Sequence, residues 1–307
     1  MSTIRVATYN LYLGADLTVV FDSADEVDLA DRARVVLDQV VATDFVGRAE
    51  ALARLLVRER VDVVGLQEVA RWSRDVGSGP PEVWLDFLVE LLSALSRTGA
   101  GYDVHACTEN FRGGAEVAGA TSMSVLGHNV VLVRRGSGIR VLAERTGDFT
   151  RTLDVVTPMP GLVLNVARSW GWLDAEVDGR PFRFVNTHLE AWDADVRAAQ
   201  RDQLLLEIDD PGVPVVVVGD FNAEPAEVGM PEEYVDAWAV AGEGDGLTCG
   251  QAADLTGESS LGERIDYVFV RDARVERSWV VGHRDEDRAA SGLWPSDHAG
   301  VVAEVTL

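Results

Sequence analysis

The sequence predicts an α/β fold, in which helices and β-strands alternate along the chain and pack in layers. Two observations indicate this fold. Short runs of β-branched and other apolar residues, each bounded by polar or turn residues, are typical of buried strands; they cover Ile4–Thr8, Val61–Leu66, Val130–Val133, Phe182–Asn186, Pro214–Val218, Ile265–Val270 and Gly300–Val305. Amphipathic stretches between these runs predict helices over Phe45–Arg60, Pro81–Arg97 and Ala194–Ile208.

Individual elements differ in the strength of their signal. The helix over Phe45–Arg60 places Leu52, Leu55 and Leu56 on one face, and its charged residues, Arg48 among them, lie largely elsewhere. The run of four valines that ends at Val218 is the strongest signal for a central strand.

The composition predicts one globular domain over residues 1–307. The 307 residues, 47% of them hydrophobic, suffice for one large core or two small ones. Polar motifs run from Asn10 to His298, so that no cut leaves a half with all of them. The N-terminus lacks the pattern of a signal peptide, and no apolar stretch reaches the ~20 residues of a membrane span. We therefore expect a cytoplasmic monomer without a membrane span.

The charge limits the class of partner. All 27 basic residues are arginine, and with 51 acidic residues the formal net charge is −24. A protein that grips duplex DNA presents a basic face to its phosphates, whereas the field of this chain repels polyanions. Duplex DNA is therefore disfavoured as a partner, although a local arginine patch stays open. The two cysteines, Cys107 and Cys249, fit no metal-ligand spacing and no disulfide framework.

Polar motifs stand where the apolar runs stop, so that all of them are able to meet at one mouth of a sheet. Any one of them alone is a weak signal, but a series spread over the whole chain is not chance. In chain order the motifs are Thr8-Tyr9-Asn10, Leu66-Gln67-Glu68-Val69, Asn186-Thr187-His188-Leu189, Gly219-Asp220-Phe221-Asn222, Arg264-Ile265-Asp266-Tyr267 and Ser296-Asp297-His298-Ala299-Gly300.

This series resembles the endonuclease/exonuclease/phosphatase superfamily, which includes apurinic endonucleases, DNase I-like nucleases, neutral sphingomyelinases and inositol-polyphosphate phosphatases. The resemblance covers residues 4–304, and the motifs follow the order of the family. It implies a DNase I-like four-layer sandwich, in which two mixed β-sheets pack together and helices flank them.

Glu68 is the candidate metal ligand. A carboxylate that leaves a buried strand is costly unless a cation or hydrogen-bond donors lie nearby; taken alone, a surface glutamate at a strand end is the commoner explanation. Hard oxygen ligands suit Mg²⁺, with Mn²⁺ as the alternative ion. The resemblance implies that Asn10 belongs to the same metal site and that Asp297 stays near the metal.

Asp220 and Asn222 are candidate catalytic residues. A Gly-Asp turn that merely closes a strand is the alternative explanation. Asp220 is suited to orient or deprotonate an attacking water, and Asn222 is suited to bind a phosphate oxygen. The resemblance gives the motif these same roles.

The remaining candidates are carried by the resemblance. It implies that Asp266 pairs with His298 and holds it charged toward the phosphate, because a carboxylate raises the pKa of a histidine. It implies that His188 donates to a phosphate oxygen. Arg168 fits a position from which family members stabilise charge on the phosphate; stacking on Trp170 or Trp172 is the alternative. The acidic partner of His188 is not identifiable, and Glu109 is only a candidate.

These residues predict a Mg²⁺-dependent phosphoesterase that attacks phosphorus with water in a single step. The acidity of the chain favours a small-molecule or lipid-headgroup phosphoester as substrate. A nuclease with a local basic groove is the second hypothesis, and a non-catalytic binding module that kept the fold is the third.

Two stretches resemble insertions beside the mouth of the site. Gly14–Asp44 is acidic and follows the first strand directly. Asn110–Gly127 is rich in Gly and Ala and predicts a mobile loop. We expect both stretches to be loops. They either influence which substrate binds or are ordinary solvent-exposed loops.

Overall fold

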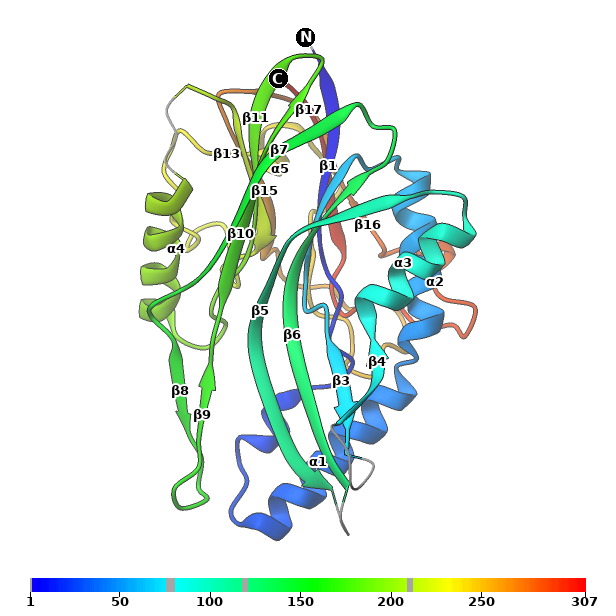
Figure 1. Ribbon diagram of the computed structural model, residues 1–307, viewed down its shortest axis with the longest axis vertical. Helices are drawn as coiled ribbons and strands as arrows, with labels where there is room; N and C mark the ends of the chain where they lie inside the picture. Colours follow the sequence, from blue (N-terminus) through cyan, green and yellow to red (C-terminus); the bar gives the residue numbers. More distant parts are fainter. Residues whose placement is uncertain (1, 76–80, 118–120, 209–211) are drawn as a thin grey trace.

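The computed structural model describes residues 2–75, 81–117, 121–208 and 212–307. Within them the strands form two large mixed sheets that pack against each other, and helices cover the outer faces (Figure 1). Helix α4 (Ala194–Ile208) lies on one flank, and α2 (Phe45–Arg58) and α3 (Phe87–Arg97) lie on the other. The predicted four-layer α/β sandwich is therefore confirmed.

The first sheet joins both ends of the chain. Strand β1 runs parallel to β2 and antiparallel to β17, with Asn10 of β1 opposite Gln67 of β2. Asn10 and Glu68 therefore leave neighbouring strands at the same edge. The strand order is β14 (Gly242–Glu243), β16 (Arg274–Val281), β17 (Gly300–Thr306), β1 (Thr3–Asn10), β2 (Val63–Gln67), β6 (Thr121–Arg134), β3 (Arg71–Arg74) and β4 (Glu82–Asp86), and β5 (Tyr102–Val117) pairs with β6.

The second sheet places three polar residues in one row. His188 of β11 lies opposite Asp220 of β12, and Asp220 lies opposite Asp266 of β15. The strand order is β13 (Val235–Asp236), β15 (Asp266–Arg271), β12 (Val215–Asp220), β11 (Arg180–His188), β10 (Ser169–Val177) and β7 (Ile139–Asp148). A separate two-stranded sheet pairs β8 (Leu153–Val156) with β9 (Val163–Val166).

The two sheets approach each other most closely beneath the row of polar residues. A Cβ atom at Gly65 would lie 2.5 Å from Val218 Cγ2 and 2.6 Å from Asn186 Oδ1. The amide of Gln67 donates to that same oxygen across 2.6 Å. This buried hydrogen bond and the missing side chain at Gly65 fix the distance between the strand ends that carry the polar motifs.

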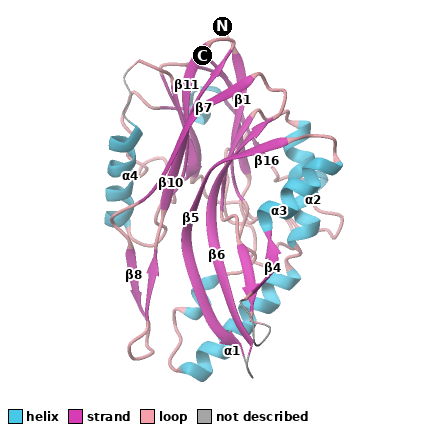
Figure 2. Ribbon diagram, viewed as in Figure 1, coloured by secondary structure: helices cyan, strands magenta, loops and turns pink. Residues whose placement is uncertain are grey.

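Four further helical elements complete the described chain, and helices are distinguished from strands by colour in Figure 2. Asp25 caps α1 by accepting hydrogen bonds from the backbone amides of Val27 and Asp28. No helix in the described ranges is long and apolar enough to span a membrane. The further elements are η1 (Leu17–Val20), α1 (Glu26–Ala42), α5 (Ala237–Ala241) and η2 (Asp285–Asp287).

Three segments have a secondary structure that differs from the sequence prediction. The expected loop Asn110–Gly127 belongs to the long β5–β6 hairpin, apart from residues 118–120, which lie outside the described residues. Its glycines are tolerated because backbone pairing with β6 does not need their side chains. The expected loop Gly14–Asp44 contains η1 and α1. The expected helix Pro81–Arg97 begins at Phe87, because Glu82–Asp86 pairs with β3 as β4.

Candidate active site

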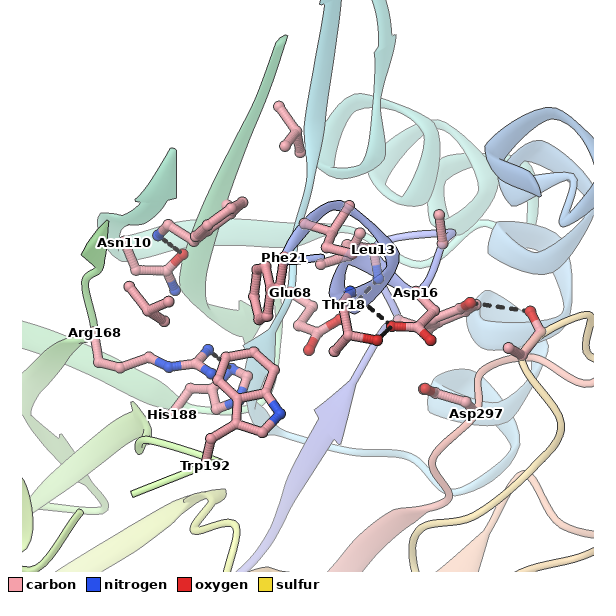
Figure 3. A pocket seen from close by; sticks show the side chains of 18 of the residues that line it. Leu13, Asp16, Thr18, Phe21, Glu68, Asn110, Arg168, His188, Trp192 and Asp297 are labelled. Carbon is pink, nitrogen blue, oxygen red and sulfur yellow. Dashed lines mark hydrogen bonds between the residues drawn. The ribbon is translucent and has the colours of Figure 1, made fainter. Parts of the chain in front are cut away.

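A pocket of about 360 Å³ opens where the strand ends of both sheets meet. Four of the residues predicted from the motifs line it: Glu68, Arg168, His188 and Asp297. Arg168 and His188 approach from one side and Asp297 from the other, with Glu68 between them (Figure 3). The other predicted residues lie behind this lining or beside it.

The backbone turns sharply where these motifs begin. Glu68 has φ of 53° and Asn222 has φ of 49°, both in the left-handed region that residues other than glycine rarely adopt. Glu68 directly follows Gln67, the last residue of the buried strand β2, and Asn222 lies two residues after Asp220, the last residue of the buried strand β12. Such conformations persist only where the surrounding structure enforces them, and they are typical of functional sites.

Asp220 is the centre of a buried polar network. Its Oδ2 accepts a hydrogen bond from Asn10 Nδ2 at 3.0 Å, and it lies 3.5 Å from His188 Nε2 and 3.8 Å from His298 Nε2. Burial and the neighbouring Asp266 raise the pKa of Asp220 to about 6, although His298 opposes the shift. At neutral pH this carboxylate is therefore ionised, yet basic enough to accept a proton.

Asp266 and His298 are in direct contact. Asp266 Oδ2 lies 2.9 Å from His298 Nδ1, and both residues are buried. Burial lowers the pKa of His298, but the carboxylates of Asp266 and Asp297 outweigh it, so that this pKa lies well above the usual value. The imidazolium therefore donates through Nδ1 to Asp266 and presents Nε2–H toward Asp220.

The imidazole ring of His188, unlike that of His298, is neutral. Burial and the adjacent Arg168 hold the pKa of His188 well below the usual value. Arg168 Nη1 lies 3.3 Å from His188 Nδ1. Because a guanidinium has only donors, Nδ1 accepts, and the proton of the neutral ring is on Nε2, which faces Asp220.

Arg168 does not stack on the tryptophans that follow it. The rings of Trp170 and Trp172 are covered instead by the guanidinium groups of Arg145 and Arg183. Arg168 is buried and lines the pocket.

A fully buried acid that sequence reasoning missed lies beside Arg168. Glu190 Oε2 is 3.8 Å from Arg168 Nε, and the Glu190 side chain has no exposed surface. Glu109, the candidate acid for His188, makes an exposed ion pair with Arg112 instead. The only signal for Glu190 was its place two residues after His188, just past a strand end.

Asn222 lies beside the pocket and is not among its lining residues. Its backbone amide donates to Asp220 Oδ1 at 2.9 Å, and its side-chain amide donates to the carbonyl of Leu189 at 3.0 Å. The structure thus brings Asn222 to Asp220, where it holds the carboxylate, but it does not place the Asn222 amide in the lining of the pocket.

The pocket carboxylates fit a divalent cation. Glu68 Oε2 accepts a hydrogen bond from the backbone amide of Leu13, and Glu68 makes no ion pair within the described part of the chain. Burial and the negative charge of Glu68 raise the pKa of Asp297 to about 7, and the positive charge of His298 opposes this shift. A quarter of the Asp297 side chain is nevertheless exposed. Two acidic side chains that face one pocket and form no ion pair with any arginine of the described chain suit a hard cation. The Asn10 side chain accepts from the Tyr12 amide through Oδ1, and the backbone carbonyl of Asn10 accepts from Ser296, the residue before Asp297.

A second group of possible ligands is buried deeper. The carboxylates of Asp220 and Asp266 and the His298 ring have ligand atoms within 4.8 Å of one another. The Asp266–His298 hydrogen bond already occupies two of these groups. Glu68 and Asp297 therefore fit the metal better, and the buried group fits proton transfer.

Arg48 supports the two loops that contain Leu11 and Pro295, which lie beside the site residues Asn10 and Asp297. The prediction that Arg48 lies on the charged face of its helix was wrong. Its guanidinium is completely buried and donates to the carbonyls of Leu11 and Pro295 at 2.8 and 2.9 Å. Leu11 follows Asn10, and Pro295 lies two residues before Asp297. Burial lowers the pKa of Arg48 to about 10, which leaves it charged at neutral pH. Its carbonyl partners satisfy the guanidinium.

The protein is a four-layer α/β sandwich with acidic, amide and histidine side chains at the strand ends of both sheets. The chain belongs to the Endonuclease/Exonuclease/phosphatase family, whose model matches residues 7–298. Members of this family are mostly phosphoesterases and nucleases, and they typically use a divalent metal. No curated protein matches the chain.

Solved structures share the fold over the full length. A family protein from Bacteroides vulgatus is 21% identical, with a TM-score of 0.63 and 100% of both chains covered. A humanized D. rerio TDP2 is 17% identical, with a TM-score of 0.63 and 100% of both chains covered. The mannosyl-6-phosphatase Bt3783 of Bacteroides thetaiotaomicron is 18% identical, with a TM-score of 0.62, and 99% of this chain and 100% of that chain are covered. At these identities the similarity establishes the fold alone.

Proposed function

We propose that this protein is a Mg²⁺-dependent phosphoesterase that hydrolyses a small-molecule or lipid-headgroup phosphoester by attack of water on phosphorus. The observation that carries the proposal is the meeting of Glu68 and Asp297 with His188 and Arg168 in one pocket, directly in front of Asp220. A Mg²⁺ ion, with Mn²⁺ as the alternative, would supply Lewis acidity and a more acidic bound water.

The residues of the chain have complementary roles in this proposal. Asp220, with its raised pKa, orients the water and accepts its proton. The His298 imidazolium, aligned by Asp266, and the Arg168 guanidinium neutralise the charge that develops on the phosphate oxygens. Glu68 and Asp297, backed by Asn10, hold the cation. Asn222 holds Asp220 through its backbone amide, and we propose its side-chain amide as a donor to a phosphate oxygen.

The electrostatics favour a small substrate over duplex DNA. Arg168 is the single arginine among the described residues that line the site pocket, and Asp16, Glu68 and Asp297 are acidic. A DNA-binding groove neutralises several phosphates with Lys and Arg. One of the structures that share the fold is named as a mannosyl-6-phosphatase, which agrees with the proposed reaction class. Because the site draws on residues from Asn10 to His298, we also infer that residues 1–307 form one domain.

A phosphoester panel tests the proposal. Phosphomonoesters, phosphodiesters and duplex DNA are incubated with the protein in Mg²⁺, Mn²⁺ or EDTA. We expect hydrolysis of at least one small phosphoester that EDTA abolishes. Metal-dependent cleavage of DNA with submicromolar, salt-sensitive binding would favour the nuclease instead. No hydrolysis of either class would support a binding module on this fold.

A further inference from the structure

A second cavity of about 410 Å³ continues from the site pocket, and we call it the apolar slot. Its lining is mainly aliphatic and aromatic side chains of three elements: η1 with α1, the β5–β6 hairpin, and the stretch that contains β9. Residues that line both cavities are Leu17, Phe21, Asn110, Phe111 and Val125. The slot is therefore an extension of the site and not a separate hollow.

The elements that build the slot extend beyond the layered body. The β5–β6 and β8–β9 hairpins project to the same end of the molecule as α1 (Figure 1). Both α1 and β9 pack against β5. The segments expected from the sequence to be loops thus form the walls of a defined cavity beside the proposed metal ligands.

The junction between pocket and slot is aromatic. Phe21 lines both cavities, and its ring meets Trp192 edge to face at 5.3 Å. Both residues lie over the pocket that holds Arg168 and His188 (Figure 3). A group attached to a phosphate in the site would pass Phe21 on its way into the slot.

We infer that the slot binds an apolar alkyl or aryl group of the substrate while its phosphate lies in the site pocket beside Arg168 and His188. This inference rests on the proposed function and names its substrate class. The slot walls are mostly apolar, among them Ala33 and Val36, and the polar side chains Asn110, Arg112 and Asn165 in the lining already form hydrogen bonds within the protein. A cavity of this size is typical of a small-molecule site. An apolar group also adds no charge, which suits a chain of net charge −24.

Binding of alkylphosphonates tests the inference without requiring turnover. Methyl-, butyl- and octylphosphonate are titrated into the protein with Mg²⁺ by isothermal calorimetry. Each methylene that enters the slot should tighten binding by up to about fourfold, and the gain should stop when the chain outgrows the slot. The same titrations with the methyl compound report the phosphonate site alone.

Two matched variants locate the effect. Val163 lines the slot and is 51% exposed, so that Val163→Asp places a charge at the rim without opening the core. Its cross-strand partner Val156 is 78% exposed and does not line the slot, which makes Val156→Asp the control. We expect the octyl-to-methyl affinity ratio to fall about tenfold or more in Val163→Asp, and to be unchanged in Val156→Asp. Ala115→Phe, which fills the slot, should shorten the longest chain that still gains affinity.

The outcomes separate this inference from the proposed function. The inference would be overturned if affinity did not rise with the length of the alkyl chain, if no phosphonate bound, or if Val163→Asp and Val156→Asp lost equal affinity. Hydrolysis in the phosphoester panel would then still support the proposed function. An affinity that rises with chain length in the wild type, but not in Val163→Asp, would support binding of an apolar group in the slot. If the phosphoester panel then showed no hydrolysis, the proposed function alone would fail.

Discussion

Asp266 and His298 join the two sheets of the sandwich through one buried hydrogen bond of 2.9 Å between Oδ2 and Nδ1. Asp266 is the first residue of β15 in the six-stranded sheet. His298 lies two residues before β17 in the nine-stranded sheet. The aspartate fixes which way the imidazole faces and keeps it charged, so that the pair acts as one unit.

A double-mutant cycle tests this coupling. We expect Asp266→Asn and His298→Ala each to reduce kcat/KM by roughly 10²–10⁴-fold, the usual range for a general acid–base group. The double variant should be little worse than the worse single variant, since each change already removes the unit. Thermal unfolding of all three proteins controls for loss of fold. Rate losses that simply multiply would show that the two residues act independently.

Arg48 should be essential for stability. Replacing a buried guanidinium with Met leaves the carbonyls of Leu11 and Pro295 without donors, so that Arg48→Met should lower the free energy of unfolding by about 3–5 kcal/mol. Arg54→Met, on the exposed side of the same helix, is the control and should cost under about 1 kcal/mol. Urea unfolding measures both. Equal, small losses in the free energy of unfolding of both variants would mean that the Arg48 guanidinium does not support the site loops.

The acidic pocket gives a defined dependence on pH. The folded pKa values of Asp220 and Asp297, about 6 and about 7, exceed the ordinary value of 3.8. Folding therefore favours the protonated carboxyls, and their contribution to stability is complete below pH 3.8 and is lost as the pH rises through about 6 to 7. Binding of Mg²⁺ needs the ionised form of Asp297, so that the affinity for Mg²⁺ should rise as the pH approaches and passes about 7.

Calorimetry with EDTA and with Mg²⁺ measures both trends. Asp297→Asn removes one of the titrating groups and is the reference. In EDTA the difference in thermal stability between wild type and Asp297→Asn should move in favour of the variant as the pH rises. A difference that stays constant from about pH 4 to 8 would contradict the raised pKa of Asp297.

The sequence predicted the layered fold because its central strands carry continuous apolar runs. The Val215–Val218 run and the segment before Glu68 are buried strands with a partner on both sides, as their apolar runs predict, and their ends carry the polar motifs. The motif order also led to residues that the structure does bring together, such as Asp220 and His188.

The missed features depend on contacts distant in sequence. The described part of the Asn110–Gly127 segment is extended because Arg112–Val117 pairs with Thr121–Leu126, which its Gly-rich composition does not reveal. Arg48 looked like a surface residue because no local pattern marks a guanidinium that satisfies distant carbonyls. Glu190 was missed for the same reason, since its partner Arg168 lies on another strand end.

The metal dependence of Glu68→Gln tests the central claim most directly. Loss of a pocket carboxylate should weaken cation binding and reduce phosphoester hydrolysis in Mg²⁺ by about a hundredfold or more, with partial recovery at high Mn²⁺. Glu109→Gln is the control, because Glu109 is exposed and outside the pocket lining.

The measurement compares hydrolysis of one small phosphoester by wild type, Glu68→Gln and Glu109→Gln, each in EDTA and across Mg²⁺ and Mn²⁺ concentrations. The account predicts that EDTA abolishes wild-type turnover, that Glu109→Gln behaves as wild type, and that Glu68→Gln needs far more metal. Wild-type turnover that persists in EDTA and is equal in Glu68→Gln would contradict it.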